Sequence, residues 1–461
     1  MAPVIRHLGH AGFAFSWGGV RLLIDPWFTP AFLGSWFPWP DNRQMAAEAH
    51  GDFLYVSHAH EDHFDRRFLA GLDKDIRVLV PRFPSRQMER ELRALGFTDL
   101  IPLGHGEQYQ VTAGFTVTML LDPAKEDSAL LVDAGGFRFL DANDCEVPAS
   151  QWPGQVDVLA CQFSGASWYP HCYAYPPDVM TAKTAEVRVS ALERLARKVR
   201  ATGARMFLPS AGPAVFLDPA LAAYNDRAGI FPWWEDVRAR FIDAVPGVPV
   251  IPPLRVSGTV DDYRRERRRE WEAWHDQPDT PATAAEVHAH FGRLQQVNRR
   301  FLAGWPRDVT LDAGGRSWNV RLGAVPLEED PAEPGWRIHV PPRVLRAILD
   351  GRASWETALL SMRARLHEGP GGYDSVLLGL LQAGHRPAQT RTLARLRDDG
   401  EEIERDGLVM QRWCPHAGED LTYATVRDGT VECPRHHWRW DTATGRCTAG
   451  GDMPLRVRQA T

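Results

Sequence analysis

The length and composition of the chain limit the kind of protein it can be. A chain of 461 residues exceeds what one hydrophobic core usually organises, so we expect two or three domains, and 44% hydrophobic with 24% charged residues is ordinary for a globular protein. The net charge of −6 provides no basic surface for nucleic acid, and no apolar run approaches the roughly 20 residues that cross a bilayer. The N-terminal residues lack the apolar core of a signal peptide, so a cytoplasmic protein is expected.

Residues 1–245 have the pattern of a layered domain of strands and helices. Short runs of aliphatic, β-branched and aromatic residues bounded by turn formers, at 20–25, 53–56 and 76–80, predict buried strands. Helical periodicity predicts helices over 85–95 and 184–201. The pattern indicates the α/β or α+β class with strands in layers.

A histidine-rich motif directly follows the strand predicted at 53–56. In Ser57-His58-Ala59-His60-Glu61-Asp62-His63, the alternating histidines place two imidazoles on one side, and Asp62 with His63 supplies a carboxylate and a third imidazole around a second metal ion. Without a metal, buried histidines would leave several polar atoms to satisfy. This His-x-His-x-Asp-His pattern is typical of the metallo-β-lactamase superfamily, and it predicts His58, His60, Asp62 and His63 as metal ligands.

Residues 246–397 follow a proline-rich junction and carry no motif with evident chemistry. A charged stretch with several tryptophans predicts helix, strand-like runs follow at 318–322 and 336–340, and 343–366 has a helical pattern. The basic run at 264–270 is expected to be a solvated helix face, since the net charge is negative. A scaffold, a substrate cover and a dimer surface remain open roles for this segment.

Residues 398–461 return to short strands and turns and contain the second motif. Cys414-Pro415-His416 and Cys433-Pro434-Arg435-His436 are separated by sixteen residues. Two thiolates and two imidazoles form the Rieske arrangement, in which histidines replace cysteines on one iron of a [2Fe–2S] cluster. Zinc can use the same four residues, but the Cys-x-His spacing and the proline after each cysteine are more typical of Rieske proteins.

The remaining residues of this C-terminal segment are given other roles. The sequence predicts a surface or supporting role for His437 and no ligand role for Cys447. Because the lobe is short, its supporting strands are expected to come from the middle segment.

The N-terminal segment resembles CMP-N-acetylneuraminate hydroxylase. The resemblance covers most of residues 5–225, and it is carried by segments at 7–12, 25–27, 34–36, 57–63, 140–145, 163–167 and 207–213. That family also joins a metallo-β-lactamase fold to a Rieske centre, although there the Rieske part is N-terminal. The resemblance implies an αββα sandwich over 1–245, followed by a helical or α+β segment over 246–397 and an all-β Rieske domain over 398–461.

The resemblance also implies further ligands at the N-terminal site. Asp144 corresponds to the carboxylate that can bridge two metals, and Asp122 stands where the family has a histidine before a proline. The usual last histidine of the superfamily is replaced by Ser210, and His171 could substitute for it, although a surface or buried role for His171 is the stronger expectation. The residues that could line a pocket, or equally belong to the core, are His10, Trp27, Trp36, Trp168 and Tyr169.

Two metal sites in one chain favour redox chemistry, because a zinc hydrolase has no use for an electron-carrying cluster. The sequence therefore predicts an O₂-dependent hydroxylase or N-oxygenase in which a Rieske cluster supplies electrons to one or two non-haem irons. The substrate class is a small polar molecule such as an amino sugar, a nucleotide sugar or an amine, and Asp62 and Asp144 are the predicted catalytic residues.

The electron donor is expected to be a separate protein, since no dinucleotide-binding fingerprint is present. A ferredoxin or a cytochrome b5-like protein with its reductase fits that role, and a homo-oligomer is left open. One alternative is a zinc-dependent hydrolase with a structural or regulatory iron–sulfur domain. Another is a redox-sensing regulator that binds a partner.

Overall fold

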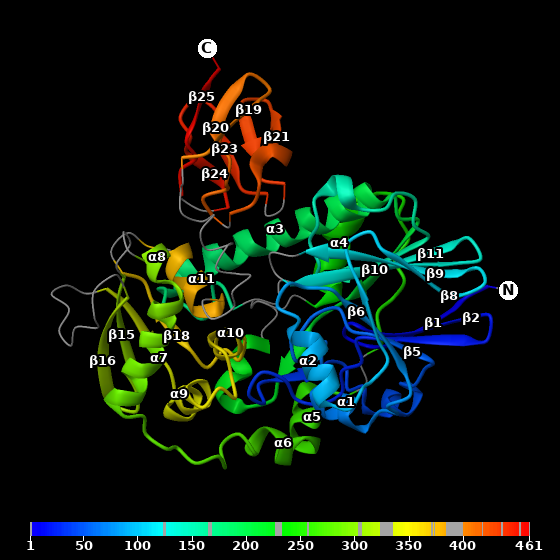
Figure 1. Cartoon of the computed structure of the whole chain (residues 1–461), viewed down its shortest axis with the longest axis horizontal. Coiled ribbons are helices and arrows are strands. Elements are labelled where there is room, and N and C mark those ends of the chain that lie inside the picture. The colour runs from blue at the N-terminus through cyan, green and yellow to red at the C-terminus, as the bar shows by residue number, and fades with distance from the viewer. Residues whose placement is uncertain are drawn as a thin grey trace. The chain divides into compact units, whose positions relative to one another are not determined.

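The computed structural model describes most of the chain as two compact units (Figure 1). The described residues are 2–122, 126–164, 168–225, 233–255, 258–302, 307–322, 335–369, 372, 374–383, 400–416, 418–434, 437–450 and 453–460. The first unit comprises Met1–Ala166 with Val187–His275, and the second comprises Ser167–Glu186 with Asp276–Thr461. The domain boundaries near 245 and 397 stay predictions.

The first sheet of the first unit carries the histidine-rich motif at the end of a central strand. Its order is β1-β2-β3-β5-β6-β7, with strands at Val4–Gly9, Gly12–Trp17, Val20–Ile24, Phe53–Tyr55, Arg77–Pro81 and Leu100–Leu103. The pairs from β3 to β7 are parallel, as buried apolar strands with helical crossovers require. The crossover helices are α1 (Arg66–Gly71) and α2 (Gln87–Ala94), and α2 confirms the helix predicted at 85–95.

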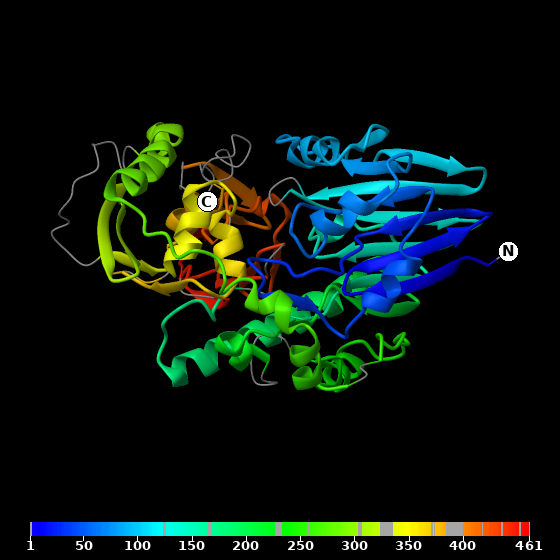
Figure 2. The ribbon, with the colours of Figure 1, turned by 90° about the horizontal axis from the view of Figure 1, so that it is seen from below.

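The second sheet of this unit supplies the acidic residues. Its order is β13-β12-β11-β10-β9-β8, with strands in chain order at Gln108–Thr112, Phe115–Asp122, Asp127–Ala134, Phe137–Asn143, Val158–Gln162 and Met206–Ser210. β11, β12 and β13 run parallel, so their C-terminal ends meet at one edge of the sheet. Figure 2 shows the first sheet in blue and the second in cyan to green, stacked on each other.

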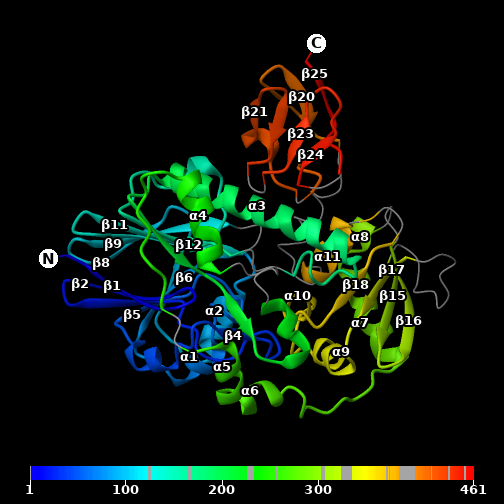
Figure 3. The same cartoon turned by 180° about the vertical axis from the view of Figure 1, so that it is seen from behind.

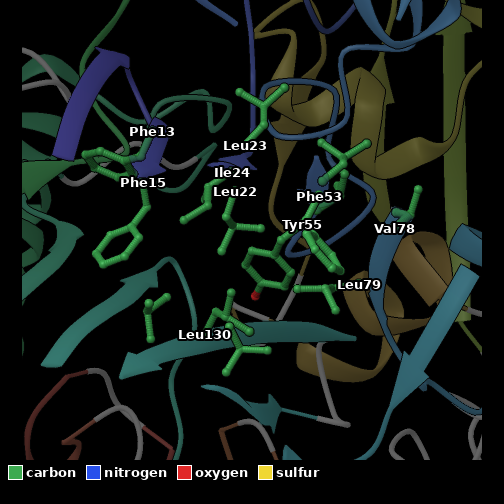
Figure 4. Packing of buried hydrophobic residues seen from close by; sticks show 14 of the residues in the cluster. Phe13, Phe15, Leu22, Leu23, Ile24, Phe53, Tyr55, Val78, Leu79 and Leu130 are labelled. Carbon is green, nitrogen blue, oxygen red and sulfur yellow. The ribbon is translucent and has the colours of Figure 1, made fainter. Parts of the chain in front are cut away.

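The core between the two sheets explains why they stack. Phe15, Leu22 and Tyr55 of the first sheet share one apolar cluster with Leu130 and Val132 of the second (Figure 4 shows part of it). Along β10, Ala129 and Leu131 alternate with these leucine and valine side chains and belong to a different cluster on the outer face. This period of two is the property of a strand buried on both faces.

Helices cover the outer faces and complete the predicted αββα sandwich. Leu69 of α1 and Leu92 of α2 pack against the first sheet. Leu195 and Val199 of α3 (Pro177–Thr202) and Phe241 of α4 (Trp234–Ala244) pack against the second, where Figure 3 shows α4. The helix predicted at 184–201 therefore exists and begins earlier, and proline is well tolerated at such a start.

Smaller elements surround the sandwich. β4 (Trp36–Pro38) pairs with β14 (Ala214–Phe216), and 3₁₀ helices occupy Arg43–Glu48, Ala149–Gln151 and Pro219–Asn225. The basic run forms α5 (Val260–Glu266) and α6 (Arg268–Glu272). The expectation of a fully solvated face is wrong at Arg267, because its guanidinium lies over the Phe37 and Tyr263 rings and pairs with Glu270.

The second unit contains a four-stranded sheet of order β16-β15-β17-β18. Its strands are β15 (Arg307–Ala313), β16 (Arg316–Leu322), β17 (Trp336–His339) and β18 (Arg365–His367). The helices of this unit are α7 (Ala284–Val297), α8 (Arg299–Leu302), α9 (Pro342–Leu349), α10 (Trp355–Leu360) and α11 (Ser375–Ala383). The helical pattern at 343–366 corresponds to two helices, and its last residues lie in β18. Gly351 has a left-handed φ of 71°, and Ser354 caps α10 by accepting a hydrogen bond from the Thr357 amide, so the helical structure is interrupted between α9 and α10.

The C-terminal part of this unit is an all-β lobe. β19 (Glu402–Arg405), β20 (Leu408–Gln411) and β25 (Val457–Gln459) form one sheet, and a second has strands β21 to β24 at Thr425–Arg427, Thr430–Glu432, Arg439–Asp441 and Cys447–Ala449, with a 3₁₀ turn at Leu421–Tyr423. Both sheets therefore use strands from 402–459, and the expectation that the middle segment lends supporting strands is wrong. No helix in the described part of the chain combines the length and hydropathy needed to cross a membrane.

Candidate metal centres

The histidine-rich motif lies in the turn between β5 and α1. The His63 and Phe64 amides both donate to the His60 carbonyl and close the turn. Asp65 then caps α1 by accepting from the Phe68 amide, and it also accepts from the Phe28 and Thr29 amides. The turn is thus held between a sheet and a capped helix, which limits how far its side chains can move.

His58 and His60 face each other across this turn. The distance from His58 Nε2 to His60 Nδ1 is 2.9 Å. Two ligands bound at about 2.0–2.2 Å to one ion lie roughly 2.8–3.6 Å apart, depending on the coordination geometry, so this spacing falls within that range. His58, His63 and Asp144 also each offer a ligand atom, and these atoms lie within 4.8 Å of one another.

A second group of potential ligands consists of His10, Asp62 and His63. His10 Nε2 lies 3.1 Å from Asp62 Oδ2, and His63 Nε2 lies 4.0 Å from the same oxygen and 3.7 Å from Asp144 Oδ2. His63 belongs to both groups, so the two groups are adjacent. The sequence suggested His10 only as a pocket residue, because it lies 52 positions before Asp62 and no local spacing connects them.

The polar atoms in this site fit a bound cation. His63 Nε2, Asp62 Oδ1 and Asp144 Oδ1 are buried and have no hydrogen-bond partner. Buried polar atoms in native proteins are almost always paired, and each unpaired atom costs roughly 1–3 kcal/mol. Three such atoms among residues whose ligand atoms converge therefore fit the coordination of a metal ion.

The charges of the site point the same way. Burial by itself lowers the pKa of His63, but the Asp62 carboxylate, the hydrogen bond to Asp25 and the Asp144 carboxylate outweigh it and raise that pKa to about 10. Burial raises the pKa of Asp144, and burial together with Asp25 raises the pKa of Asp141 well above its ordinary value. The site concentrates negative charge that a cation would neutralise.

Asp25 orients the ring of His63. Its carboxylate accepts from His63 Nδ1 at 2.7 Å, from the Ser57 amide at 2.8 Å and from Asn143 Nδ2 at 3.0 Å. A carboxylate on one ring nitrogen fixes the tautomer and leaves Nε2 for a metal. In the sequence, Asp25 belongs only to the segment 25–27 that carries the family resemblance. The fold brings its carboxylate to Ser57 and Asn143.

The loop that carries Asp144 is anchored by α3. Buried Lys198 donates from Nζ to the Cys145 carbonyl at 2.8 Å and pairs with Glu146 at 3.0 Å. These contacts fix the two residues that follow Asp144. The carboxylate at the end of β11 is therefore held in place by a helix more than 50 positions later in the chain.

The predicted ligand Asp122 and the alternative candidate His171 lie outside the two groups of converging ligand atoms. Asp122 is buried at the end of β9, in register with Asp127, whose Oδ1 is 3.3 Å from His58 Nδ1. Neither group of converging ligands among the described residues includes Asp122 or His171, and His171 belongs to the second unit. The ligand roles of all these residues stay predictions.

The second motif lies at two turns of the C-terminal lobe. Cys414 and Cys433 are fully buried within one apolar cluster and are not joined in a disulfide. His416 Nδ1 lies 3.9 Å from Cys414 Sγ, and its ring stacks on Trp438 at 4.3 Å between centroids. Thiols kept buried but not paired as disulfides suit metal ligation. His436 lies outside the described residues.

The two residues excluded as cluster ligands have other partners. His437 Nδ1 pairs with Glu432 Oε1 at 2.8 Å. The Cys447 thiol donates to the Ala449 carbonyl at 3.3 Å. These contacts agree with a supporting role for His437 and a non-ligand role for Cys447.

Comparison with known proteins assigns both parts of the chain. A family model described as the Rieske [2Fe-2S] domain matches residues 388–457, and one described as the beta-lactamase superfamily domain matches residues 4–140. The protein therefore combines an N-terminal metallo-β-lactamase fold with a C-terminal Rieske domain, the class of domain that holds a [2Fe–2S] cluster.

Whole-length relatives define the family. A Rieske 2Fe-2S iron-sulfur protein, as it is named, from Mycolicibacterium smegmatis is 31% identical over 99% of this chain and 99% of its own length. A Mycobacterium tuberculosis (strain H37Rv) protein of similar name is 30% identical over 98% and 99%. The chain belongs to this family of Rieske 2Fe-2S iron–sulfur proteins.

More distant similarity reaches named hydroxylases. Cytidine monophosphate-N-acetylneuraminic acid hydroxylase of Pan troglodytes is 26% identical over 47% of this chain and 39% of its own length, which confirms the predicted resemblance. The structure of CmlA, a diiron β-hydroxylase from Streptomyces venezuelae, is similar over 55% of this chain and 53% of that chain, at 20% identity and a TM-score of 0.38.

Proposed function

We propose that the protein is an O₂-dependent oxidoreductase, a hydroxylase or N-oxygenase, with non-haem iron in the first unit and a Rieske cluster in the second. The observation that carries the proposal is the presence of both ligand sets in one chain. The converging histidine and carboxylate atoms have three unpaired members, and the lobe with Cys414 and Cys433 matches the Rieske family model.

The donor set supports iron in the first unit. Mixed imidazole and carboxylate ligation is found in non-haem iron sites, and the carboxylate share of this donor set exceeds that of the common His₃ and His₂Glu zinc sites. His58, His60, His63, Asp62 and Asp144, with Asp122, would hold one or two ions. Bound iron would supply O₂ activation there, with electrons from the Rieske cluster.

The residues of the chain orient one imidazole and keep one carboxylate ionised. Asp25 holds the proton at His63 Nδ1, which keeps Nε2 directed into the site. Burial acts to raise the pKa of Asp62, but His63 and His10 outweigh it and lower that pKa, so the carboxylate is ionised. Asp62 would therefore be present as a carboxylate, the form that binds a metal ion, and its Oδ1 has no hydrogen-bond partner.

The substrate and the electron donor are inferred from chemistry and from relatives. Relatives named for hydroxylation of a cytidine monophosphate sugar support a small polar substrate such as an amino sugar, nucleotide sugar or amine. The Rieske domain requires a one-electron donor, for which a ferredoxin or cytochrome b5-like protein with its reductase is suited.

A zinc-dependent hydrolase is the second candidate. It is favoured by the turn at Ser57–His63, since Asp62 could act as a general base on a metal-bound water. In that case the C-terminal cluster would have a structural or regulatory role.

Spectroscopy and metal analysis test the proposal. Dithionite-reduced protein is expected to show a Rieske-type electron paramagnetic resonance signal, and iron in excess of the cluster iron should be bound at the N-terminal site. A reducing system should then drive O₂ consumption with a small amine or amino-sugar substrate. A colourless protein with zinc in both sites, or turnover without O₂, would reject the proposal.

A further inference from the structure

We infer that His10 is a metal ligand and takes the place of the histidine that Ser210 replaces at the end of β13. The inference rests on the proposed function in one respect only, that the first unit binds metal. It goes further by naming the residue that completes the position beside Asp62 and His63.

The imidazole of His10 lies where a ligand of that position must lie. Its Nε2 is 3.1 Å from Asp62 Oδ2, within the roughly 2.8–3.6 Å expected between two ligands of one ion. His10 is only 3% exposed, and its ligand atom converges with those of Asp62 and His63. Asp62 Oδ1 and His63 Nε2, which have no hydrogen-bond partner, belong to the same group.

The backbone of His10 is joined to the end of β13. The amide of Ala211, the residue after Ser210, donates to the His10 carbonyl at 3.0 Å. The Ser210 side chain is buried and donates to Asn143 Oδ1 at 3.2 Å. Two turns therefore meet at the position of the missing histidine, and the turn between β1 and β2 supplies the imidazole there.

This turn is built to hold one conformation. His10 has a left-handed φ of 48°, which costs energy for a residue with a side chain. Gly9 precedes it, and a Cβ on Gly9 would lie 2.6 Å from Asn42 Nδ2, the atom that donates to the Leu8 and Trp27 carbonyls. The ring of Trp27 meets the His10 ring edge-on at 4.7 Å. Strain of this kind persists where the surrounding structure fixes a functional side chain.

The rival role for His10 is to donate a hydrogen bond to Asp62 without binding metal. His10→Gln separates the two, because a glutamine amide can donate to Asp62 but is a poor ligand for these ions. His10→Asp is the opposite case, since a carboxylate can bind a metal. His7→Gln is the matched control in β1, because His7 Nε2 lies 3.0 Å from the His10 carbonyl and the His7 ring stacks on Phe13, away from both groups of converging ligand atoms.

The experiment is Co²⁺ titration of the full-length protein from which the first-unit metal has been removed. Ions bound per chain and the visible cobalt absorption are both recorded. We expect His10→Gln to weaken the binding of one Co²⁺ ion at least tenfold and to change the cobalt absorption. His10→Asp should still bind that ion, and His7→Gln should bind Co²⁺ as the unchanged protein does.

Retention of the ion and its spectrum in His10→Gln would overturn the inference. If His10→Gln does not fold, Ser210→His is added to a His10→Ala background, where recovery of the ion supports the inference and failure to recover it in a folded protein rejects it. Neither outcome depends on which metal the native protein uses. Failure of the proposed function would appear separately, as the lack of a Rieske signal or of O₂ consumption.

Discussion

The carboxylate of Asp25 fixes the orientation of the His63 ring in the first unit. Asp25 is fully buried and is bonded to His63, Ser57 and Asn143, so it joins the turn after β5 to the end of β11. Its effect on metal binding would be indirect, because it accepts from His63 Nδ1, whereas His63 Nε2 is the proposed ligand atom.

Asp25→Asn should weaken metal binding in the first unit by about 10–100-fold, because the amide cannot match the carboxylate as an acceptor for His63 Nδ1. Competition with a coloured chelator measures this. Asp52→Asn is the matched control, since the Asp52 carboxylate accepts from the Arg21 amide at the surface. An unchanged affinity in Asp25→Asn would show that His63 is oriented by other contacts.

The cysteines of the C-terminal lobe separate into two kinds. Cys433→Ala should abolish the Rieske signal and the visible colour, because one thiolate ligand of the cluster is lost. Cys447→Ala should retain both, because its thiol donates to a carbonyl and is half-buried. Electron paramagnetic resonance of the two purified variants makes the comparison. A signal lost only in Cys447→Ala would reassign the ligands.

At the scale of elements, the sites depend on where strands end and where helices begin. The histidine turn follows β5, Asp144 follows β11, and α1 begins directly after the histidine turn. Asp65 connects α1 to the segment after β3, because it caps α1 and forms hydrogen bonds of 2.7 to 3.0 Å with Phe28, Thr29 and Phe68.

Asp65→Ala should lower the free energy of unfolding of the first unit by about 3 kcal/mol, because it leaves several buried amides without an acceptor. Thr283→Ala, which removes the cap of α7 in the second unit, should cost only about 1 kcal/mol. Calorimetry of both variants gives the comparison. Equal shifts would indicate that Asp65 acts only as a helix cap.

At the scale of the whole molecule, the two proposed metal sites belong to different compact units. Metal bound to the first unit and the cluster bound to the second should therefore stabilise separate parts of the chain.

Chelation of the first-unit metal should lower the midpoint temperature of one thermal unfolding transition and leave the midpoint of the other unchanged. An ion present at 100 times its Kd stabilises the folded state by about 2.7 kcal/mol, and removing it removes that contribution. Scanning calorimetry with and without chelator measures the shift, and the visible absorption of the cluster shows that the second unit has kept its iron. A shift in both transitions would mean that the units do not unfold independently.

The sequence by itself determined the features that depend on local spacing. The ligand candidates from His58 to His63 lie within six residues, and the Cys-x-His and Cys-x-x-His motifs each lie within four residues. These patterns predicted a layered domain of strands and helices, a metal site and a Rieske arrangement, whereas the αββα sandwich was implied by the family resemblance.

Only the tertiary structure decided which distant residues meet. His10 and Asp62 are 52 positions apart, and Asn143 reaches Asp25 across 118 positions. Such pairs form because parallel strands of two stacked sheets end at a common edge, and the position of each end depends on the register and packing of the whole sandwich. No periodicity within a short window carries that information, so the ring of His10 beside Asp62 appears only once the chain is folded.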